Sequence, residues 1–439
     1  MPCCKAASSA RYADGSRKGN SMMVIRNVRL VANGLITPCD IVVENGRIAA
    51  IGRFDESGRV IDAHGLYLSH GFIDIHVHGG GGHDFMDATR EAWHGAGALH
   101  LSHGTTAMVP TTLAAGKKEL LSALRIFNLC SPGFADGPKL LGVHVEGPYL
   151  SPKWSGAQDP EYIRNPEPEE YEEILAVCPG ILRWTAAPEL PGAFELGDRL
   201  TEYGVVPCIG HSDASYEEVC GAMLHGYRHV THLYSAMSTI VRKMGFRHAG
   251  IVESAYLLDG LSSEVIADGC HLPGCLLQMA YRFIGPDRLC LITDAMRAAG
   301  QMEGESILGS LENGQRVILE DGVAKMPDRQ AFAGSICTAD RLVRNMVQLA
   351  GASLPDAVKM ITETPARVLG LSGQTGSVAV GRAADLVLFD ENIQVQMVMV
   401  DGEVRWTQNG FDAGRSGSGQ EGINYPIAIE RRGKSEKIL

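Results

Sequence analysis

Short runs of apolar, often β-branched residues recur through the middle of the chain, and most are separated by segments of helical length. Runs that are apolar at nearly every position are typical of parallel strands covered on both faces. Their alternation with helices predicts an α/β fold, and eight such units can close into a (β/α)8 barrel of the TIM type. The predicted strands are Gly71–Val77, Thr105–Thr111, Leu140–Val145, Leu182–Ala187, Val205–Ile209, His229–His232, Glu264–Ala267 and Leu289–Thr293.

The regions on either side of these strands show shorter strand signals and tight turns. Asn45-Gly46 lies between Ile41–Val43 and Arg47–Ala49, which is a strong hairpin signal, and a second hairpin is expected at Val400–Val404. Neither region has enough apolar faces to stand alone, so we expect one small β-sandwich built from both. The predicted division is a sandwich of 22–70 and 371–410, an inserted barrel of 71–370, and flexible tails at 1–21 and 411–439.

Size and composition agree with this organisation. The 439 residues, 45% of them hydrophobic and 21% charged, are enough for a full barrel and a second unit. The formal net charge of −12 argues against nucleic-acid or anionic-membrane partners, but it leaves room for a local basic pocket. No apolar stretch is long enough to cross a membrane. The 11 cysteines form no Cys-x-x-Cys pair, which is typical of a protein in the reducing cytoplasm.

Polar residues with metal-binding side chains follow the predicted strands. His76 and His78 alternate at the end of the first strand, so both imidazoles face the same side. Active sites of such barrels lie at the carboxyl ends of the strands, and imidazole with carboxylate suits a divalent metal. The residues in this position are His76, His78, Glu146, His211, His232 and Asp294.

The motifs around these residues resemble those of the amidohydrolase superfamily and, within it, of the N-acetylglucosamine-6-phosphate deacetylases. They include Val145-Glu146-Gly147-Pro148, Gly210-His211-Ser212-Asp213, Thr231-His232-Leu233-Tyr234-Ser235-Ala236-Met237, Asp268-Gly269-Cys270-His271 and Thr293-Asp294-Ala295. The resemblance covers about residues 22–410. It implies hydrolysis of the N-acetyl group of a hexosamine 6-phosphate, which releases acetate, by a homodimeric enzyme.

Glu146, His211 and His232 would hold one ion and leave a position open for water, as catalytic zinc sites do. The metal would lower the pKa of that water toward about 7, and Asp294 would act as general base and then general acid. His76 and His78 could hold a second ion with Glu146 as the bridge, because relatives that keep this histidine pair hold two. Zinc is the expected metal, with iron, manganese and cobalt as alternatives. The predicted fourth strand has no lysine, which argues against a carbamylated bridge.

The resemblance also implies a set of substrate contacts, in which this chain departs from its relatives at two positions. Gln158 stands where relatives have a histidine that polarises the acetyl carbonyl, and Ser235 stands where they have asparagine. Arg242, Lys243 and Arg247 form a basic group that suits a phosphate. The expected substrate residues are Ala157, Gln158, Ser235, Ala236, Arg242, Lys243, Arg247, His271, Phe332, Ala333 and Gly334.

Other interpretations stay open at this point. The substrate could be the galactosamine epimer, or the chain could be a sugar-phosphate-binding relative without catalysis, although a pure binder has no use for Asp294 beside a metal. The basic group at 242–248 could be a solvated loop, and Asp294 could be a helix N-cap. His144 could support a metal ligand without touching the ion.

Overall fold

The computed structural model describes residues 22–54, 58–131, 134, 137–301 and 303–413. The predicted tail at 1–21, and all but the first three residues of the tail at 411–439, lie outside these residues.

Parallel strands form the centre of the molecule. They make one sheet of order β10-β9-β6 and a second of order β11-β12-β13-β14-β17-β18, and each of the eight predicted barrel strands overlaps at least one of them. The predicted strand Leu140–Val145 is divided between β10 and β11. The bounds are β6 Phe72–Val77, β9 Thr105–Pro110, β10 Lys139–Leu140, β11 Val143–Glu146, β12 Ile181–Ala186, β13 Val206–Ile209, β14 His229–Val230, β17 Ser262–Val265 and β18 Leu289–Leu291.

Single parallel bridges join the two sheets at the carboxyl ends of their strands. Thr111 pairs with His144 after β9, and Val77 pairs with Ala295 after β18. Side chains on β6 alternate, so Ile73 and Ile75 share a face and pack with Ala366 and Leu369. His76, next to Ile75, therefore faces the opposite side, where the strands enclose the candidate site.

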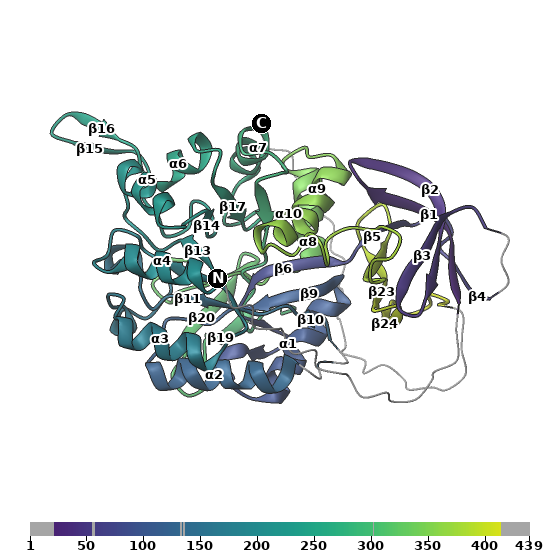
Figure 1. Cartoon of the computed structure of the whole chain (residues 1–439), viewed down its shortest axis with the longest axis horizontal. Helices are drawn as coiled ribbons and strands as arrows, with labels where there is room; N and C mark the ends of the chain where they lie inside the picture. Colours follow the sequence, from purple (N-terminus) through teal and green to yellow (C-terminus); the bar gives the residue numbers. More distant parts are fainter. Residues whose placement is uncertain (1–21, 55–57, 132–133, 135–136, 302, 414–439) are drawn as a thin grey trace, which may run out of the picture.

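Helices surround these strands on the outside (Figure 1). Hydroxyl side chains begin several of them: Thr89 accepts from the N–H of Ala92 at α1, and Ser215 forms a capping box with Glu218 at α5. The helices are α1 Arg90–Ser102, α2 Lys117–Cys130, α3 Pro168–Val177, α4 Ala193–Glu202, α5 Tyr216–Leu224, α6 Ile251–Leu257, α7 Gly274–Phe283, α8 Ala339–Gln348, α9 Leu354–Ile361 and α10 Glu363–Val368. Short 3-10 turns occur at η1 Phe85–Asp87, η3 Pro152–Trp154 and η4 Pro160–Tyr162.

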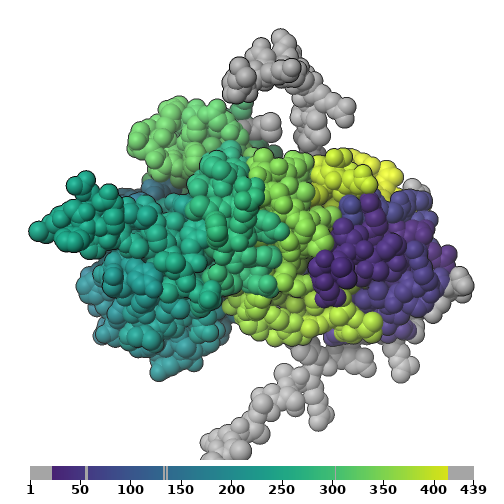
Figure 2. Space-filling model, turned by 90° about the horizontal axis from the view of Figure 1, so that it is seen from above, coloured from purple at the N-terminus to yellow at the C-terminus, as the bar shows by residue number. Residues whose placement is uncertain are grey.

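Strands from both chain ends share one hydrogen-bonded sheet. Its order is β24-β23-β22-β5-β1-β2-β3, with β4 also paired to β1. Figures 1 and 2 show the purple N-terminal and yellow C-terminal strands together at one end of the molecule. One core joins apolar side chains of both ends, among them Ile25, Ile41 and Met397. The strands are β1 Met23–Ala32, β2 Leu35–Glu44, β3 Arg47–Gly52, β4 Arg59–Asp62, β5 Tyr67–His70, β22 Leu386–Phe389, β23 Val395–Val400 and β24 Glu403–Thr407.

Both hairpins that the sequence predicts here are present, as β2–β3 and β23–β24.

Three further groups of strands were not predicted from the sequence. An antiparallel sheet of β19 Gly304–Leu308, β20 Gln315–Glu320 and β21 Val323–Lys325 follows β18, and a hairpin of β15 Val241–Lys243 and β16 Phe246–His248 follows β14. The short pair β7 Gly79–Gly80 and β8 His83–Asp84 follows β6. All are short insertions at the carboxyl side of the parallel strands. Among the described residues, no helix is long and apolar enough to span a membrane.

Candidate metal centre

The parallel strands bring together all six polar residues that the sequence places at their ends. His76 is the next-to-last residue of β6 and His78 lies just beyond it, Glu146 ends β11, and the other three follow β13, β14 and β18. Two groups have ligand atoms within 4.8 Å of one another: His76 with His78 and Glu146, and Glu146 with His211 and His232. Glu146 belongs to both groups, so its carboxylate lies between two candidate ion positions.

The Nε2 atoms of the four histidines converge on Glu146. Oε1 of the carboxylate lies 3.1 Å from His232 Nε2, and 3.4 Å from the Nε2 atoms of both His76 and His211. Oε2 lies 3.3 Å from His78 Nε2. The four imidazoles are buried, and such a concentration of nitrogen and oxygen donors around one carboxylate is what a divalent metal requires.

Hydrogen bonds on the far side of two rings favour the same conclusion. His76 Nδ1 lies 3.1 Å from Glu264 Oε2, and His211 Nδ1 lies 2.9 Å from the carbonyl oxygen of Trp154. Both partners accept hydrogen bonds, so the ring protons belong on Nδ1 and the Nε2 lone pairs face Glu146. His78 and His232 have buried Nδ1 atoms with no hydrogen-bond partner among the described residues. The donor set fits one or two metal ions.

Opposite charges dominate the pKa values of the cluster. Burial lowers the pKa of His76, but Glu146, Asp294 and Glu264 outweigh it and raise that pKa to about 10. Burial raises the pKa of Glu146, whereas His76 and hydrogen bonds from His211 and His232 bring it well below its usual range. A metal ion bound to these histidines would compete with protons for the same nitrogen atoms.

The backbone at three of these positions is in the left-handed region. His211 has φ of 50°, His232 of 27° and Asp294 of 47°, a conformation that is uncommon for residues other than glycine. Such conformations persist where the surrounding structure imposes them, and they concentrate at functional sites.

Gly210 is required for close packing, because a Cβ there would lie 2.6 Å from the Thr185 side chain.

Asp294 faces the first histidine pair. Its Oδ1 lies 3.2 Å from His78 Nε2 and 3.4 Å from His76 Nε2. Burial raises its pKa, but the charge on His76 and the hydrogen bond from His78 outweigh that effect, so the pKa lies below its usual range. An ionised carboxylate in this position can accept a proton from a group bound between the histidines and itself. It begins no helix among the described elements, which argues against the N-cap interpretation.

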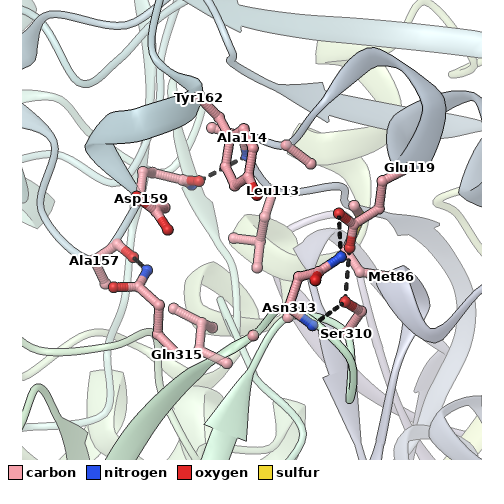
Figure 3. Close-up of a pocket in the computed structure, with 15 residues that line it drawn as sticks. Met86, Leu113, Ala114, Glu119, Ala157, Asp159, Tyr162, Ser310, Asn313 and Gln315 are labelled. Atoms are coloured by element: carbon pink, nitrogen blue, oxygen red, sulfur yellow. Dashed lines mark hydrogen bonds between the residues drawn. The ribbon is translucent and has the colours of Figure 1, made fainter.

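Gln158 lies beside Glu146 in the structure. Its Nε2 donates to Glu146 Oε2 over 2.7 Å, and its Oε1 accepts from the N–H of Ala114 over 2.8 Å. On its other side Gln158 lines a hollow of about 350 Å³, open solvent included, between the loop after β9 and the hairpin β19–β20. Figure 3 shows Gln315 at this hollow, where it donates to the carbonyl oxygen of Ala157 over 2.7 Å.

The sequence pattern of the amidohydrolase family matches residues 67–405. The chain belongs to the amidohydrolase family. The resemblance that the motifs indicate is thus confirmed at the family level. This amidohydrolase is 35% identical to the N-acetylglucosamine-6-phosphate deacetylase of Lysinibacillus sphaericus, over 88% of this chain and 98% of the relative. It is 33% identical to the N-acetylgalactosamine-6-phosphate deacetylase of Escherichia coli O157:H7, over 87% and 98%.

A solved structure of a related enzyme has a similar fold. It is a mutant N-acetyl-D-glucosamine-6-phosphate deacetylase from Mycobacterium smegmatis in complex with N-acetyl-D-glucosamine-6-phosphate. The TM-score is 0.80 with 30% sequence identity, over 88% of this chain and 100% of that one.

Several other residues that the motifs single out are linked to the cluster through the backbone. Ser235 N donates to His232 O over 2.9 Å, and Ala236 O accepts from the N–H of Ser212 over 3.2 Å. His271 is held by Asp268, with 2.8 Å between Nδ1 and Oδ2, and its ring centroid lies 4.8 Å from that of Phe332. Ala333 and Gly334 directly precede Ser335, whose N–H donates to Asp294 O over 2.7 Å.

In the part of the chain that the structure describes, no hydrogen bond or ion pair joins the three cations expected at a phosphate to the cluster. Arg242, Lys243 and Arg247 are exposed on the hairpin β15–β16, which projects from the body of the amidohydrolase (Figure 1). The hydrogen bond of Arg247 is to the carbonyl oxygen of Gly245 in the same hairpin.

Two residues near the cluster have contacts that the sequence pattern indicates weakly or not at all. The pattern does not single out Glu264, and it gives a supporting role for His144 only as an alternative. Glu264 is the first residue of the predicted strand Glu264–Ala267, and no local motif distinguishes it from a structural residue. His144 is buried, with its ring centroid 4.6 Å from that of His76 and its Nε2 2.7 Å from Thr185 Oγ1. His144 lies two residues before Glu146 on a strand, and this spacing predicts that both side chains face the same side.

Proposed function

We propose that this amidohydrolase removes the N-acetyl group of N-acetyl-D-glucosamine 6-phosphate and releases D-glucosamine 6-phosphate and acetate. The observation that carries the proposal is the meeting of Asp294 with a buried four-histidine, one-glutamate cluster. It occurs in a chain related along its length to enzymes named for this reaction. A protein that only binds the sugar phosphate has no need of an ionised carboxylate there.

In the proposed site Glu146, His211 and His232 would hold one ion, and His76, His78 and Glu146 would hold a second. Zinc suits four imidazoles and a carboxylate, and iron, manganese or cobalt would also accept them. When bound, the metal supplies Lewis-acid chemistry, which activates water and polarises a carbonyl.

Asp294 moves the proton in this proposal. It takes a proton from the attacking water as the new C–O bond forms, and returns it to the amide nitrogen as the C–N bond breaks. The amine leaves neutral, which an amide cleavage at neutral pH requires. Nε2 of Gln158 has a second hydrogen besides the one bound to Glu146, and this hydrogen would donate to the developing oxyanion.

Substrate recognition in this proposal depends on residues outside the metal cluster. Arg242, Lys243, Arg247 and His271 would bind the 6-phosphate, because an acidic chain needs a local source of positive charge for a dianion. Ala157, Ser235, Ala236, Phe332, Ala333 and Gly334 would contact the sugar.

The proposal extends to the architecture and assembly. The two parallel sheets, with their bridges Val77–Ala295 and Thr111–His144, support a closed (β/α)8 barrel over 71–370. We propose that it is inserted into a β-sandwich of 22–70 and 371–410, and that the protein acts in the cytoplasm as a homodimer.

Acetate release from a panel of sugars tests the function. The panel holds N-acetylglucosamine and N-acetylgalactosamine, each with and without the 6-phosphate. The proposal expects the highest kcat/KM on N-acetylglucosamine 6-phosphate. A higher value on the galactosamine epimer would support the second candidate, which the 33% identical relative named for that epimer favours. No acetate release from any sugar by metal-loaded protein would overturn the deacetylase assignment.

A further inference from the structure

A fully buried carboxylate lies directly behind the candidate metal cluster. Glu264 is on β17, and its side chain has no exposure to solvent. It is outside both groups of candidate ligands. A buried charge is costly unless it is paired and hydrogen-bonded, so its contacts indicate what it is for.

Its two oxygens have separate sets of partners. Oε1 pairs with the guanidinium of Arg183 and lies 3.2 Å from His229 Nε2. Oε2 accepts from the backbone N–H of His232 over 3.1 Å and lies 3.1 Å from His76 Nδ1.

Arg183 prevents this carboxylate from turning away. It is itself fully buried on β12, and its guanidinium also donates to the carbonyl oxygen of Ile75 over 3.1 Å. His229 is held from its other side, with 2.6 Å between Nδ1 and Ser262 Oγ. With Arg183, His229 and the N–H of His232 in place, Oε2 is directed at the Nδ1 of His76.

A carboxylate in that position decides which nitrogen of His76 carries the proton. An oxygen that can only accept requires the hydrogen on Nδ1, and this leaves the Nε2 lone pair facing Glu146 and Asp294. It also restrains the rotation of the ring and makes Nε2 a stronger donor toward a metal.

We propose that Glu264, held by Arg183, is a positioning residue that orients His76 for the ion shared by His76, His78 and Glu146. The proposal rests on the metal-dependent function above. It predicts that this second ion, and not the ion of Glu146, His211 and His232, depends on Glu264. A purely structural role, as the partner of Arg183 in the core, would change stability without changing the number of ions.

Two variants separate the roles. Glu264→Gln keeps the shape and removes the charge, and Glu264→Asp keeps a negative charge beside Arg183 but withdraws it from His76. Elemental analysis of the purified full chain counts the ions, and titration of metal-free protein with Co²⁺, followed by its visible absorption, measures the affinity of each site. We expect both variants to bind the second ion about 10- to 100-fold more weakly and to keep the first.

A matched control and a double variant complete the test. Asp340→Asn removes another buried, paired carboxylate, which contacts His103 and Arg344 away from the cluster, and should leave both Co²⁺ affinities unchanged. Adding Glu264→Gln to His76→Ala should weaken Co²⁺ binding no further than His76→Ala alone. Wild-type Co²⁺ affinities in both Glu264 variants would overturn the proposal, as would a wild-type ion count in His76→Ala. Because these readouts need no sugar, they are independent of whether acetate is released.

Discussion

Gln158 and Glu146 are joined by a hydrogen bond of 2.7 Å between the amide nitrogen and one carboxylate oxygen. The N–H of Ala114 donates to the amide oxygen of Gln158, which establishes which end of the amide faces Glu146. Resemblance to relatives implies a substrate contact at this position, whereas the structure shows a contact with the shared candidate ligand. One amide can do both, since Nε2 carries two hydrogens.

We therefore predict a double effect for Gln158→Ala. Loss of the hydrogen bond frees the Glu146 carboxylate, and loss of the second N–H removes a donor to the oxyanion, so kcat should fall about 10- to 100-fold. Steady-state kinetics with measured metal content checks this. Gln315→Ala, at the other side of Ala157, is the control and should keep most of the activity. Wild-type kcat in Gln158→Ala would remove this side chain from the mechanism.

Asp294→Asn should leave folding and metal content nearly intact while kcat falls by at least about 100-fold. The amide cannot accept and return the proton that the carboxylate moves. Single-turnover assays of the metal-replete variant measure the effect. Near-normal turnover would exclude Asp294 as the general base.

The two histidine groups should differ in their importance. His211→Ala or His232→Ala should abolish binding of the essential ion and with it the activity. The double variant His76→Ala/His78→Ala should retain one ion and part of the rate. Elemental analysis counts the ions. Retention of an ion in His211→Ala, with loss of all metal in the double variant, would reverse the assignment of the two sites.

Neutralising the hairpin cations should affect the phosphorylated sugar alone. Arg242→Gln or Arg247→Gln is expected to raise KM for the 6-phosphate more than about tenfold, which corresponds to roughly 1.4 kcal/mol of binding. Turnover of the sugar without phosphate should stay at its low level. If the wild type hydrolyses both sugars equally well, the phosphate site is wrong, although the deacetylase chemistry stands.

The lowered pKa of Asp340 predicts one component of the pH dependence of the free energy of unfolding. Burial raises its pKa, but the charge and hydrogen bond of His103, the hydroxyl of Thr338 and the charge of Arg344 outweigh burial and lower it from 3.8 to about 2. Because the folded pKa is the lower one, the ionised carboxylate stabilises the fold fully above about pH 4. This contribution, roughly 2 kcal/mol, is lost as the pH falls from 3.8 toward 2.

Urea unfolding of the wild type and Asp340→Asn at several pH values measures this component. The difference between their free energies of unfolding should shrink as the pH falls through that range. A difference that stays constant from pH 6 to pH 2.5 would contradict the assignment.

The strand pattern and the cluster were accessible from the sequence for a simple reason. A buried parallel strand needs an apolar residue at nearly every position, so a polar residue at its end stands out. That signal identified His76, Glu146 and Asp294 before any contact was known. The hairpins at Asn45-Gly46 and at 400–404 were equally readable, because their turns have few allowed conformations.

The additional strands β15–β16 and β19–β21 could not be predicted from the sequence in this way. Their residues are only partly apolar, and these strands pair with one another and not with the parallel strands. The position of Gln158 beside Glu146 had no signal either, since it depends on where two loops meet.

The sequence by itself determined the order of strands and helices and the residues that end the strands, because local periodicity and residue type act over a few neighbours. Only the tertiary structure decided that Gln158 lies against Glu146, and that Arg183 holds Glu264 behind His76. Glu264 is 188 residues from His76 along the chain. Contacts at that separation arise when distant strands meet side by side, and no local pattern records which side chains will then face one another.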